Sequence, residues 1–329
     1  MQTIELASGF MNNRLQLSGF LNLNKPEGFT SHDCVAKVRR IFRLKRVGHG
    51  GTLDPMATGV LPIALGSATR LLPYLPTEKA YRGVIQLGLV TDTDDITGTI
   101  ISQANASEIT QAQVRQRLDI FQKGYDQLPP AYSAVQIEGK RLYQLARNGQ
   151  RIDIPTRWVD IFNLEVLAWQ PGPTPTLELS IRCGPGTYIR AIARDLGAAL
   201  GVGGTLVSLV RTKSCGFELV NALTLGDLSP ESTTLISPGL ALQHLPAIKL
   251  DSEIAKRWCC GQKMAIETVN LTTPYQVLDQ AGTLLGIGQL EDDIFRAKVV
   301  LPSHIDHSMD NNASTRNNSH DPPADDLSR

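Results

Sequence analysis

The chain has 329 residues and equal numbers of basic and acidic side chains, 32 Lys and Arg against 32 Asp and Glu. This length is sufficient for one large domain or two ordinary domains, each with its own hydrophobic core. Because the net charge is zero, it does not indicate a nucleic-acid partner. Evidence for such a partner must come from local charge patterns.

The residue pattern disfavours two classes of protein, membrane proteins and zinc proteins. No stretch reaches the ~18 apolar residues of a membrane span, and residues 1–20 lack the charged and then apolar layout of a secretion signal. The cysteines form no C-x-x-C pair and have no histidine cluster at zinc-ligand spacing; they are Cys34, Cys183, Cys215, Cys259 and Cys260. We therefore expect a cytoplasmic protein with reduced cysteines, no bound metal and no membrane partner.

The N-terminal region becomes regular only after residue 18. Residues 1–18 show little pattern and are expected to be a disordered extension. A short strand at 19–24 and a turn at 25–28 follow, and an apolar stripe then predicts a helix that Thr30 or Ser31 can cap. Basic residues dominate positions 25–46. Taken alone, such a block marks either a surface for RNA or a solvated helix face.

The stretch from Gly48 to Pro62 presents a single carboxylate. Its sequence, G-H-G-G-T-L-D-P-M-A-T-G-V-L-P, places Asp54 between a glycine-rich approach and Pro55, which removes the next backbone N–H and fixes the turn. The apolar run that follows indicates that the loop is anchored on a buried element while its carboxylate faces a cleft. An isolated Asp-Pro can also be an Asx-turn in which the aspartate only caps its own loop.

The central part of the chain alternates between predicted strands, turns and helices. Residues 81–89 predict a strand that opens with Tyr81, and the acidic turn at 91–98 does not have the spacing of an EF-hand calcium loop. A helical pattern covers 109–121. Basic and aromatic residues then mingle at 128–147, which is typical either of a surface that contacts RNA backbone and unpaired bases or of an ordinary amphipathic helix.

A second polar constellation follows the strand predicted at 177–183. The turn at 184–187 leads into a helix for which Thr187 is the expected N-cap, and Arg190 and Arg194 lie one turn apart at the positive end of this helix. An arginine in this position can hold a carboxylate or a phosphate, or it can form a purely structural ion pair.

Proline and leucine residues around 235–245 indicate a domain boundary. The segment at 241–302 contains one predicted short helix and three predicted strands. Residues 303–329 are rich in Asn, Asp, Ser and His and poor in apolar side chains. We expect this last segment to be a disordered tail.

Several of these strings resemble the bacterial TruB family of tRNA pseudouridine synthases. One departure is Gly50, where the family usually has Thr, and we expect the glycine to loosen the loop. The matching strings are the long one at 48–62, K-P at 25–26, T-D-T-x-D-x-x-G at 91–98, P-P-x-Y-S-A at 129–134 and G-x-G-T-Y-I-R at 184–190.

The resemblance assigns roles to individual residues. It implies that Asp54 is the catalytic aspartate, that Arg190 pairs with this aspartate, and that Tyr81 stacks on the target base and moves a proton. It also implies that four further residues bind the substrate, namely Lys25, His49, Tyr188 and Leu209.

The resemblance also implies a fold and an activity. The fold is α/β of the α+β type: a mixed, largely antiparallel sheet in a catalytic domain at 19–240, an RNA-gripping insertion at about 122–157, and a β-rich PUA-like domain at 241–302. The implied reaction converts uridine 55 in the T arm of tRNA to pseudouridine, without a cofactor, after the base has flipped out of its stack. We expect a monomer whose partner is the T stem-loop of tRNA.

Two other classes of function remain open on the sequence. A protein that binds and folds tRNA could carry the same surfaces, with catalysis secondary. A carboxylate-dependent glycosidic hydrolase is a weaker alternative, because it normally needs two carboxylates acting as a pair, whereas only Asp54 lies in a presented motif. The sequence also leaves open whether Asp54 attacks C1′ of the nucleotide or removes the C2′ proton.

Overall fold

The computed structural model describes residues 17–133, 136–137, 140–141, 154–263, 273–291 and 294–302. Nearly all of the expected N-terminal extension and the whole expected tail lie outside the described residues, as does much of the segment predicted to grip RNA. Among the helices of the described ranges, none is long and apolar enough to span a membrane.

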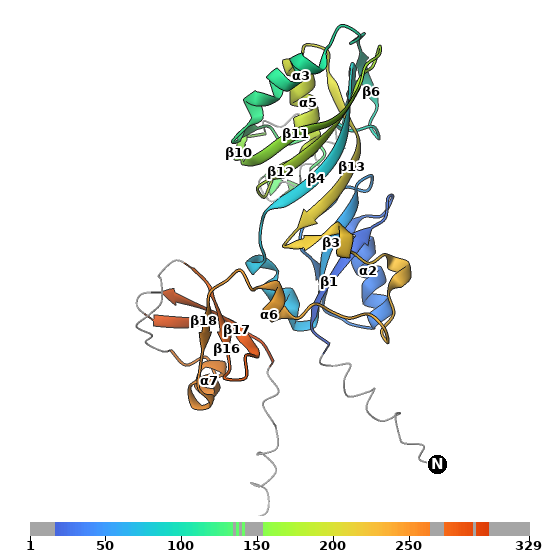
Figure 1. Ribbon diagram of the computed structural model, residues 1–329. Helices are drawn as coiled ribbons and strands as arrows, with labels where there is room; N and C mark the ends of the chain where they lie inside the picture. The colour runs from blue at the N-terminus through green and yellow to red at the C-terminus, as the bar shows by residue number, and fades with distance from the viewer. Residues whose placement is uncertain are drawn as a thin grey trace, which may run out of the picture.

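The largest element of the fold is an eight-stranded sheet (Figure 1). Its main path runs β1–β3–β13–β4–β12–β11, while β2 pairs with β3 and β14 pairs with β13. Every ladder is antiparallel except the short one between β3 and β13, which confirms the expected mixed, largely antiparallel sheet. The strands are β1 (Gly19–Lys25), β2 (Val47–His49), β3 (Thr58–Leu65), β4 (Lys79–Leu87), β11 (Ile161–Gln170), β12 (Thr176–Cys183), β13 (Gly204–Ser214) and β14 (Phe217–Glu218).

Helices pack on this sheet at two places (Figure 1). Two helices, α3 and α5, lie behind the upper strands of the sheet, which are β4, β11, β12 and β13. Helix α2 lies beside β1 and β3. Helix α2 begins as predicted, because Thr30 and Asp33 form a reciprocal capping box. Helix α5 does not: its N-cap position is Tyr188, so the predicted Thr187 cap is wrong. These helices are α2 (Ser31–Phe42), α3 (Gln111–Leu118) and α5 (Ile189–Ala199).

The helices and strands enclose two main apolar cores in this part of the chain. One core joins the upper strands to α3 and α5 through side chains such as Ile85, Leu179 and Ile192, which are all fully buried. The other joins α2 to β1 and β3 through side chains such as Leu23 and Val38. The loop that carries Asp54 connects β2 to β3 and runs between these cores, because its residues Leu53 and Ala57 belong to the first core whereas Val47 and Leu61 belong to the second.

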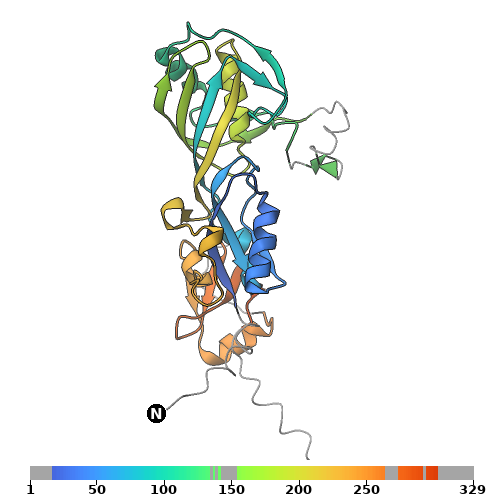
Figure 2. The ribbon, with the colours of Figure 1, turned by 90° about the vertical axis from the view of Figure 1, so that its right-hand side faces the viewer.

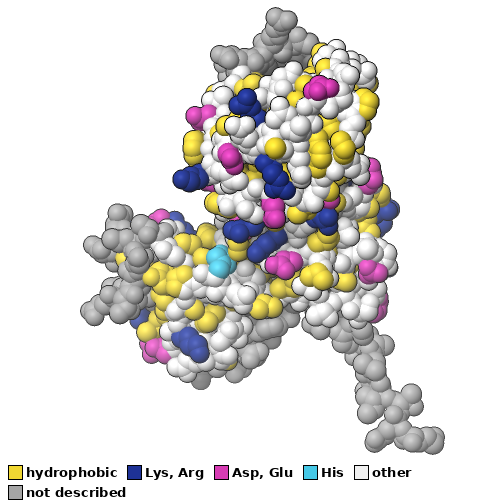
Figure 3. Space-filling view, turned by 45° about the horizontal axis from the view of Figure 1, so that its top comes forward, with side chains coloured by type: hydrophobic (Ala, Val, Ile, Leu, Met, Phe, Trp, Pro, Cys, Tyr) yellow, Lys and Arg dark blue, Asp and Glu magenta, His cyan; other side chains and the backbone are white. Residues whose placement is uncertain are grey.

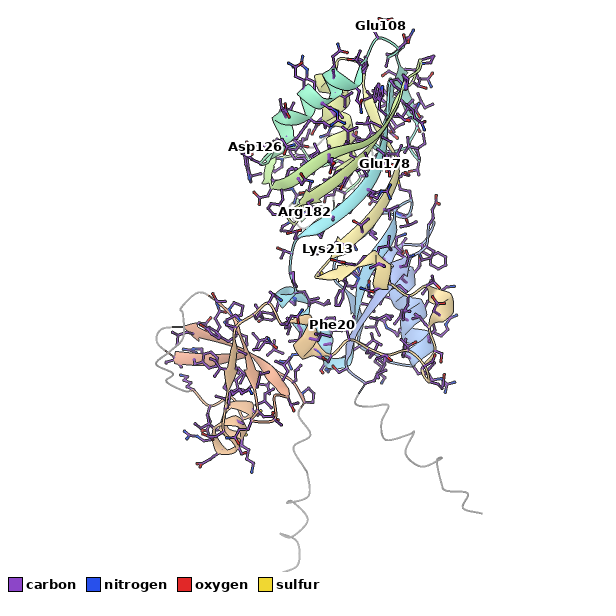
Figure 4. The ribbon with its side chains drawn as sticks, in the orientation of Figure 1. Phe20, Glu108, Asp126, Glu178, Arg182 and Lys213 are labelled. Atoms are coloured by element: carbon purple, nitrogen blue, oxygen red, sulfur yellow. The ribbon has the colours of Figure 1, made fainter. Side chains whose placement is uncertain are left out.

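The two faces of the upper sheet differ in character. The alternation of a strand sends Tyr81 of β4 and Ile181 of β12 to the core, where they are cross-strand neighbours. Figure 4 shows Glu178, Arg182 and Lys213 along the opposite, solvent-facing side. On the molecular face in Figure 3, basic and acidic side chains are interspersed, in keeping with the balanced composition.

Short two-stranded ladders and 3-10 helices complete this part of the chain. Figure 2 shows the β8–β9 ladder standing away from the main body. The ladders are β5 (Leu89–Thr91) with β6 (Ile100–Gln103), β7 (Tyr125–Gln127) with β10 (Arg157–Val159), and β8 (Gln136–Ile137) with β9 (Lys140–Arg141). The 3-10 helices are η2 (Gly66–Tyr74), η3 (Asp119–Phe121), η4 (Leu219–Asn221) and η5 (Leu225–Asp227).

A four-stranded sheet in the order β15–β16–β17–β18 forms the C-terminal part together with α7. Its core contains Trp258 and Phe295, both fully buried. This part contacts the larger sheet, because Val299 shares an apolar cluster with Phe20 of β1. The elements are α6 (Pro238–Ala241), β15 (Ala247–Lys249), α7 (Ser252–Cys259), β16 (Tyr275–Leu278), β17 (Leu284–Glu291) and β18 (Ile294–Val300).

Candidate active site

The loop between β2 and β3 presents the Asp54 carboxylate as the sequence predicts. Leu53 is only 4% exposed and anchors the loop in the core. Its backbone N–H donates to Ser31 Oγ at 2.9 Å, at the start of α2. The next residue, Asp54, turns outward and its side chain is 36% exposed. An apolar anchor beside a turn therefore places one carboxylate at the surface of a cavity.

Arg190, at the start of α5, meets this carboxylate. Its Nη2 donates to Asp54 Oδ1 at 3.2 Å, and its Nε lies 2.9 Å from Oδ2, so the guanidinium faces both carboxylate oxygens. The arginine side chain is only 5% exposed. A buried guanidinium with a geometry of this kind orients a carboxylate as well as balancing its charge. The two residues named from the sequence therefore lie in contact across 136 positions of the chain.

A second carboxylate behind Arg190 belongs to the acidic turn after β5. Asp95 Oδ2 lies 3.6 Å from Arg190 Nη1, and the same Nη1 donates to Thr93 O at 3.0 Å. Asp95 is itself buried, and its Oδ1 accepts from Thr93 Oγ1 and from the Thr97 N–H. The sequence singled out this turn only as a motif. The fixed fifth position of T-D-T-x-D-x-x-G is the signal that could have identified Asp95.

The same two arginines of α5 hold the beginning of the segment predicted to grip RNA. Arg190 Nη2 donates to Tyr132 O at 3.1 Å, and Arg194 Nη2 donates to Leu128 O at 2.7 Å. Arg194 also forms ion pairs with Asp94 at 3.0 Å and Asp195 at 2.9 Å. One turn of helix thus connects the Asp54 loop, the acidic turn and residues 128–132.

These elements surround a cavity of about 510 Å³, which is the size range of small-molecule sites. Five of the residues predicted for the site line it directly, namely Asp54, Tyr81, Tyr188, Arg190 and Leu209. The remaining lining residues are Thr30, Ser31, His32, Thr52, Leu53, Pro55, Lys79, Tyr132, Ser133, Gly186, Thr187 and Ile189.

Tyr81 lies on the core face of β4 and is only 6% exposed. Burial raises the pKa of its phenol to about 12, and the nearby Arg211 guanidinium opposes this shift. The side chain is therefore a neutral phenol at neutral pH. It can stack on a base or donate a hydrogen bond, but its pKa does not favour a resting phenolate.

Lys25 and His49, which the resemblance places in the substrate site, do not line this cavity in the described part of the chain. Lys25 is fully buried, and its Nζ donates to the carbonyl oxygens of Pro26 at 2.9 Å, Phe29 at 2.6 Å and Pro55 at 3.2 Å. His49 packs edge-on against His32, and burial lowers the pKa of its imidazole. Lys25 therefore supports the Asp54 loop from behind.

Arg211 and Cys215, which the sequence did not single out, hold the same loop from the other side. The Arg211 guanidinium is fully buried and donates to Thr52 O at 3.1 Å and Gly51 O at 3.0 Å. The Cys215 thiol donates to Gly50 O at 3.2 Å. Three consecutive carbonyl groups of the loop therefore accept hydrogen bonds from one segment, at the end of β13 and just beyond it.

The expectation that Gly50 loosens the loop is wrong. A Cβ atom at this position would lie 2.9 Å from Cys215 Sγ and 3.3 Å from Pro62 Cβ, so the glycine fills a closely packed position. Its backbone N–H also donates to Pro62 O at 2.8 Å. The Cys215 side chain occupies the space that a larger residue at position 50 would need.

Comparison with known proteins places this geometry in a family. The family model described as "TruB family pseudouridylate synthase (N terminal domain)" matches residues 39–189, and "Pseudouridine synthase II TruB, C-terminal" matches residues 246–301. A "tRNA pseudouridine synthase B" from Gloeothece citriformis is 53% identical over 84% of this chain and 92% of its own length. The chain belongs to the TruB family. The resemblance read from the sequence motifs is thereby confirmed.

Two further comparisons extend over most of the TruB-family chain. A "tRNA pseudouridine synthase B" from Trichormus variabilis is 50% identical over 86% of this chain and 98% of its own length. The structure titled "Crystal Structure of a Cbf5-Nop10-Gar1 Complex" contains a chain that is 25% identical, with a TM-score of 0.66, over 88% of this chain and 86% of that one. The similarity therefore covers the upper sheet, the site and the C-terminal sheet together.

The close contact between Gly50 and Cys215 can be tested with a destabilising substitution at one position and a compensating substitution at the other. Gly50→Thr should lower the free energy of unfolding by about 1–3 kcal/mol, because the added side chain overlaps the thiol. Cys215→Gly should restore much of this loss, since Cys215 has a φ of +55° that glycine adopts without strain.

Urea unfolding of the two single variants and the double variant measures this coupling. An unchanged stability of Gly50→Thr, or no recovery in the double variant, would contradict the close contact.

The raised pKa of Tyr81 generates a second test. The pKa of the phenol is about 10 in the unfolded chain, whereas burial raises it to about 12 in the folded protein. The neutral phenol therefore stabilises the fold fully below the unfolded pKa, and this contribution is lost as pH rises between the two values. Between these two pH values, the free energy of unfolding of the wild type should fall by about 1.4 kcal/mol per pH unit more than that of Tyr81→Phe.

Urea unfolding of both proteins at several alkaline pH values measures the difference. Parallel stability curves would show that the hydroxyl is not buried.

Proposed function

We propose that this protein isomerises uridine to pseudouridine in tRNA, with uridine 55 of the T arm as its target. The observation that carries the proposal is the contact between Asp54 and Arg190 at the wall of a cavity large enough for a nucleoside. The curated relatives with about half of their residues identical are named tRNA pseudouridine synthase B. The geometry of the cavity and the names of the relatives support the same reaction.

The cavity lies inside the protein surface, so the target uridine has to leave its stack to reach it. Flipping a nucleotide costs a few kcal/mol, which contacts in the pocket offset. Tyr81 supplies a flat aromatic ring for stacking, while Leu209 and Tyr188 supply further wall. We propose that these three side chains hold the base after it has flipped.

The reaction breaks the N1–C1′ bond, rotates the freed base and forms a C5–C1′ bond. The proton at C5 is released and N1 acquires one, so the sum is an isomerisation that needs no external reactant. Asp54 is the group that begins this sequence, either by attacking C1′ or by removing the proton at C2′. In both routes, Arg190 keeps the Asp54 carboxylate oriented.

The alternative of a glycosidic hydrolase loses support at this site. Hydrolases of that class use two carboxylates, one on each side of the scissile bond. Among the described residues that line the cavity, Asp54 is the only Asp or Glu. The nearby Asp95 faces the other side of Arg190 and is buried.

We propose that the T arm approaches the cavity between α2 and residues 128–133, the described start of the second predicted RNA-binding stretch. The first residues of α2 line the cavity, and Lys37, Arg39 and Arg40 continue along the same helix. At the other side, Tyr132 and Ser133 line the cavity where the described part of the predicted gripping segment begins. The described residues of both predicted RNA-binding stretches thus adjoin one opening. We propose that the protein acts as a monomer.

Asp54→Asn should abolish pseudouridine formation while T-arm affinity stays within about tenfold, because phosphate contacts dominate affinity for RNA. Release of tritium from tRNA labelled at C5 of uridine measures turnover, since the reaction removes that hydrogen. Filter binding measures affinity. More than trace turnover by a preparation free of host enzyme would contradict the role of Asp54.

Arg190→Lys should lower kcat by at least about tenfold, because a lysine keeps the charge but cannot face both carboxylate oxygens. The matched control is Arg82→Lys on β4, whose side chain pairs with Glu178 at 2.7 Å on the solvent-facing side of the sheet. The control should retain wild-type turnover. Near-normal kcat in Arg190→Lys would remove the proposed function of the pair.

A further inference from the structure

Lys79 is a lysine in the cavity that neither the sequence motifs nor the reaction so far accounts for. It is the first residue of β4, two positions before Tyr81, so both side chains lie on the same face of the sheet. Its cross-strand neighbours are Cys183 in β12 and Ser214 in β13. The lysine therefore enters the cavity wall from the end of three adjacent strands.

In the described part of the chain, the ammonium group of Lys79 differs from the guanidinium groups nearby because it pairs with no acceptor. Within the described ranges, it forms no hydrogen bond and no ion pair, although its side chain is half-buried. Arg190 is engaged with Asp54, and Arg211 donates its N–H groups to loop carbonyls. An ammonium group that is partly withdrawn from water and pairs with no acceptor of the described residues is stabilised by an acceptor that a ligand brings.

Burial, and then the positive charge of Arg211, lower the pKa of Lys79. An anion at this place would reverse both effects, since it would replace lost hydration and offset the repulsion between the two cations. The electrostatic environment therefore favours a negatively charged ligand over a neutral one.

The surroundings leave the ammonium open toward the cavity. A Cβ atom on Gly51 would lie 3.8 Å from Lys79 Cε and 4.0 Å from Nζ, so the absence of a side chain there leaves space beside the charge. Gly186 and Thr187, from the turn that follows β12, line the same cavity. Lys79 thus lies between the Asp54 loop and this turn.

We propose that Lys79 binds a phosphodiester group next to the flipped uridine. The inference rests on the proposed function, because it requires an RNA whose target nucleotide enters this cavity. The uracil ring is neutral, whereas each linkage on either side of the nucleotide carries a full negative charge. A lysine ammonium is a compact point charge with three donors, which suits a phosphate oxygen.

This contact has a specific consequence for substrate binding. A phosphate reaches Lys79 only when its nucleotide has left the stack, so the ion pair stabilises the flipped state and opposes the cost of flipping. The lysine is then a binding residue that acts on affinity and KM. The chemical step remains with Asp54.

The test combines a change in the protein with a change in the RNA. A T-arm hairpin is prepared with one neutral methylphosphonate linkage, either 5′ or 3′ of the target uridine. Binding is measured in the Asp54→Asn background, so that no RNA is converted, with and without Lys79→Gln. Lys213→Gln is the matched control, because Lys213 lies on β13 at the solvent-facing side of the sheet and pairs with Glu218 at 3.7 Å.

Lys79→Gln should weaken binding of the normal hairpin by about tenfold, as expected for loss of a charged hydrogen bond. It should also reduce the salt slope by about 0.7, the value for one phosphate contact in a single strand. One of the two methylphosphonates should weaken binding to the parent protein, the Asp54→Asn variant, by a similar factor. The same methylphosphonate should have no further effect when Lys79→Gln is added to this variant. Lys79→Arg should recover part of the affinity, and Lys213→Gln should bind like the parent.

Three results would overturn the assignment of Lys79 to phosphate. One is normal affinity and salt slope in Lys79→Gln. Another is an equal loss from each methylphosphonate with and without the lysine. The third is normal RNA binding by Lys79→Gln combined with a fall in kcat when Asp54 is intact, which would place the ammonium on the uracil ring.

Failure of the proposed function gives a different pattern. A wild-type protein that forms no pseudouridine would refute that function, whereas the binding comparison would still show whether Lys79 contacts a phosphate. If the parent bound no T-arm hairpin, both proposals would be overturned.

Discussion

The ion pair between Arg190 and Asp54 is the contact on which the site depends. It joins a loop between two N-terminal strands to the first turn of a helix 136 residues further along. The arginine needs this partner, since its side chain is almost completely buried and an unpaired buried charge is strongly unfavourable. Asp95, Thr93 O and Tyr132 O satisfy the rest of the guanidinium. The arginine therefore fixes the carboxylate and also the segments that form the opposite wall.

The loop that carries Asp54 is held by cations and a thiol that donate to its backbone carbonyls. Lys25 donates from one side, and Arg211 and Cys215 donate from the other. Donation to carbonyl groups leaves the loop side chains free for other contacts, so the carboxylate can turn to the cavity. A glycine-rich loop would lose conformational entropy on being ordered. These hydrogen bonds oppose that loss, which explains why fully buried basic side chains lie below a flexible sequence.

The sequence was most informative where local chemistry decides the structure. The presented carboxylate at Asp54 and the arginine at the start of a helix were each recognisable from local chemistry, while their pairing and the largely antiparallel sheet followed from the family resemblance. Long-range contacts that no motif marks were not recognisable. Arg211 lies in an apolar strand, and its role depends on carbonyl groups about 160 positions away. The fit of Gly50 against Cys215 likewise required coordinates, because packing decides whether a glycine loosens a loop or fills a tight place.

The cap of helix α5 shows a related limit of local reasoning. Thr187 has the right chemistry for an N-cap, but its hydroxyl donates to Gly184 O and stabilises the preceding turn instead. Helix α5 then starts one residue later, with Tyr188 as the N-cap residue. That shift makes Ile189 the first helical residue and Arg190 the second, so the guanidinium lies at the helix end that faces the loop. A local competition between two hydrogen bonds thus helps to set the position of a group that a distant carboxylate requires.

The polarity of the cavity explains why its chemistry favours isomerisation over hydrolysis. Asp54 is the single carboxylate among the described lining residues, and the Tyr81 phenol is neutral because burial raises its pKa to about 12. Neither group is arranged as a second base that would activate water against C1′ after the N1–C1′ bond breaks. Leu209 and the aromatic rings of Tyr81 and Tyr188 line the space in which the freed base would turn. We propose that a released base confined there meets C1′ again through C5, so that the new carbon–carbon bond forms within the same nucleotide.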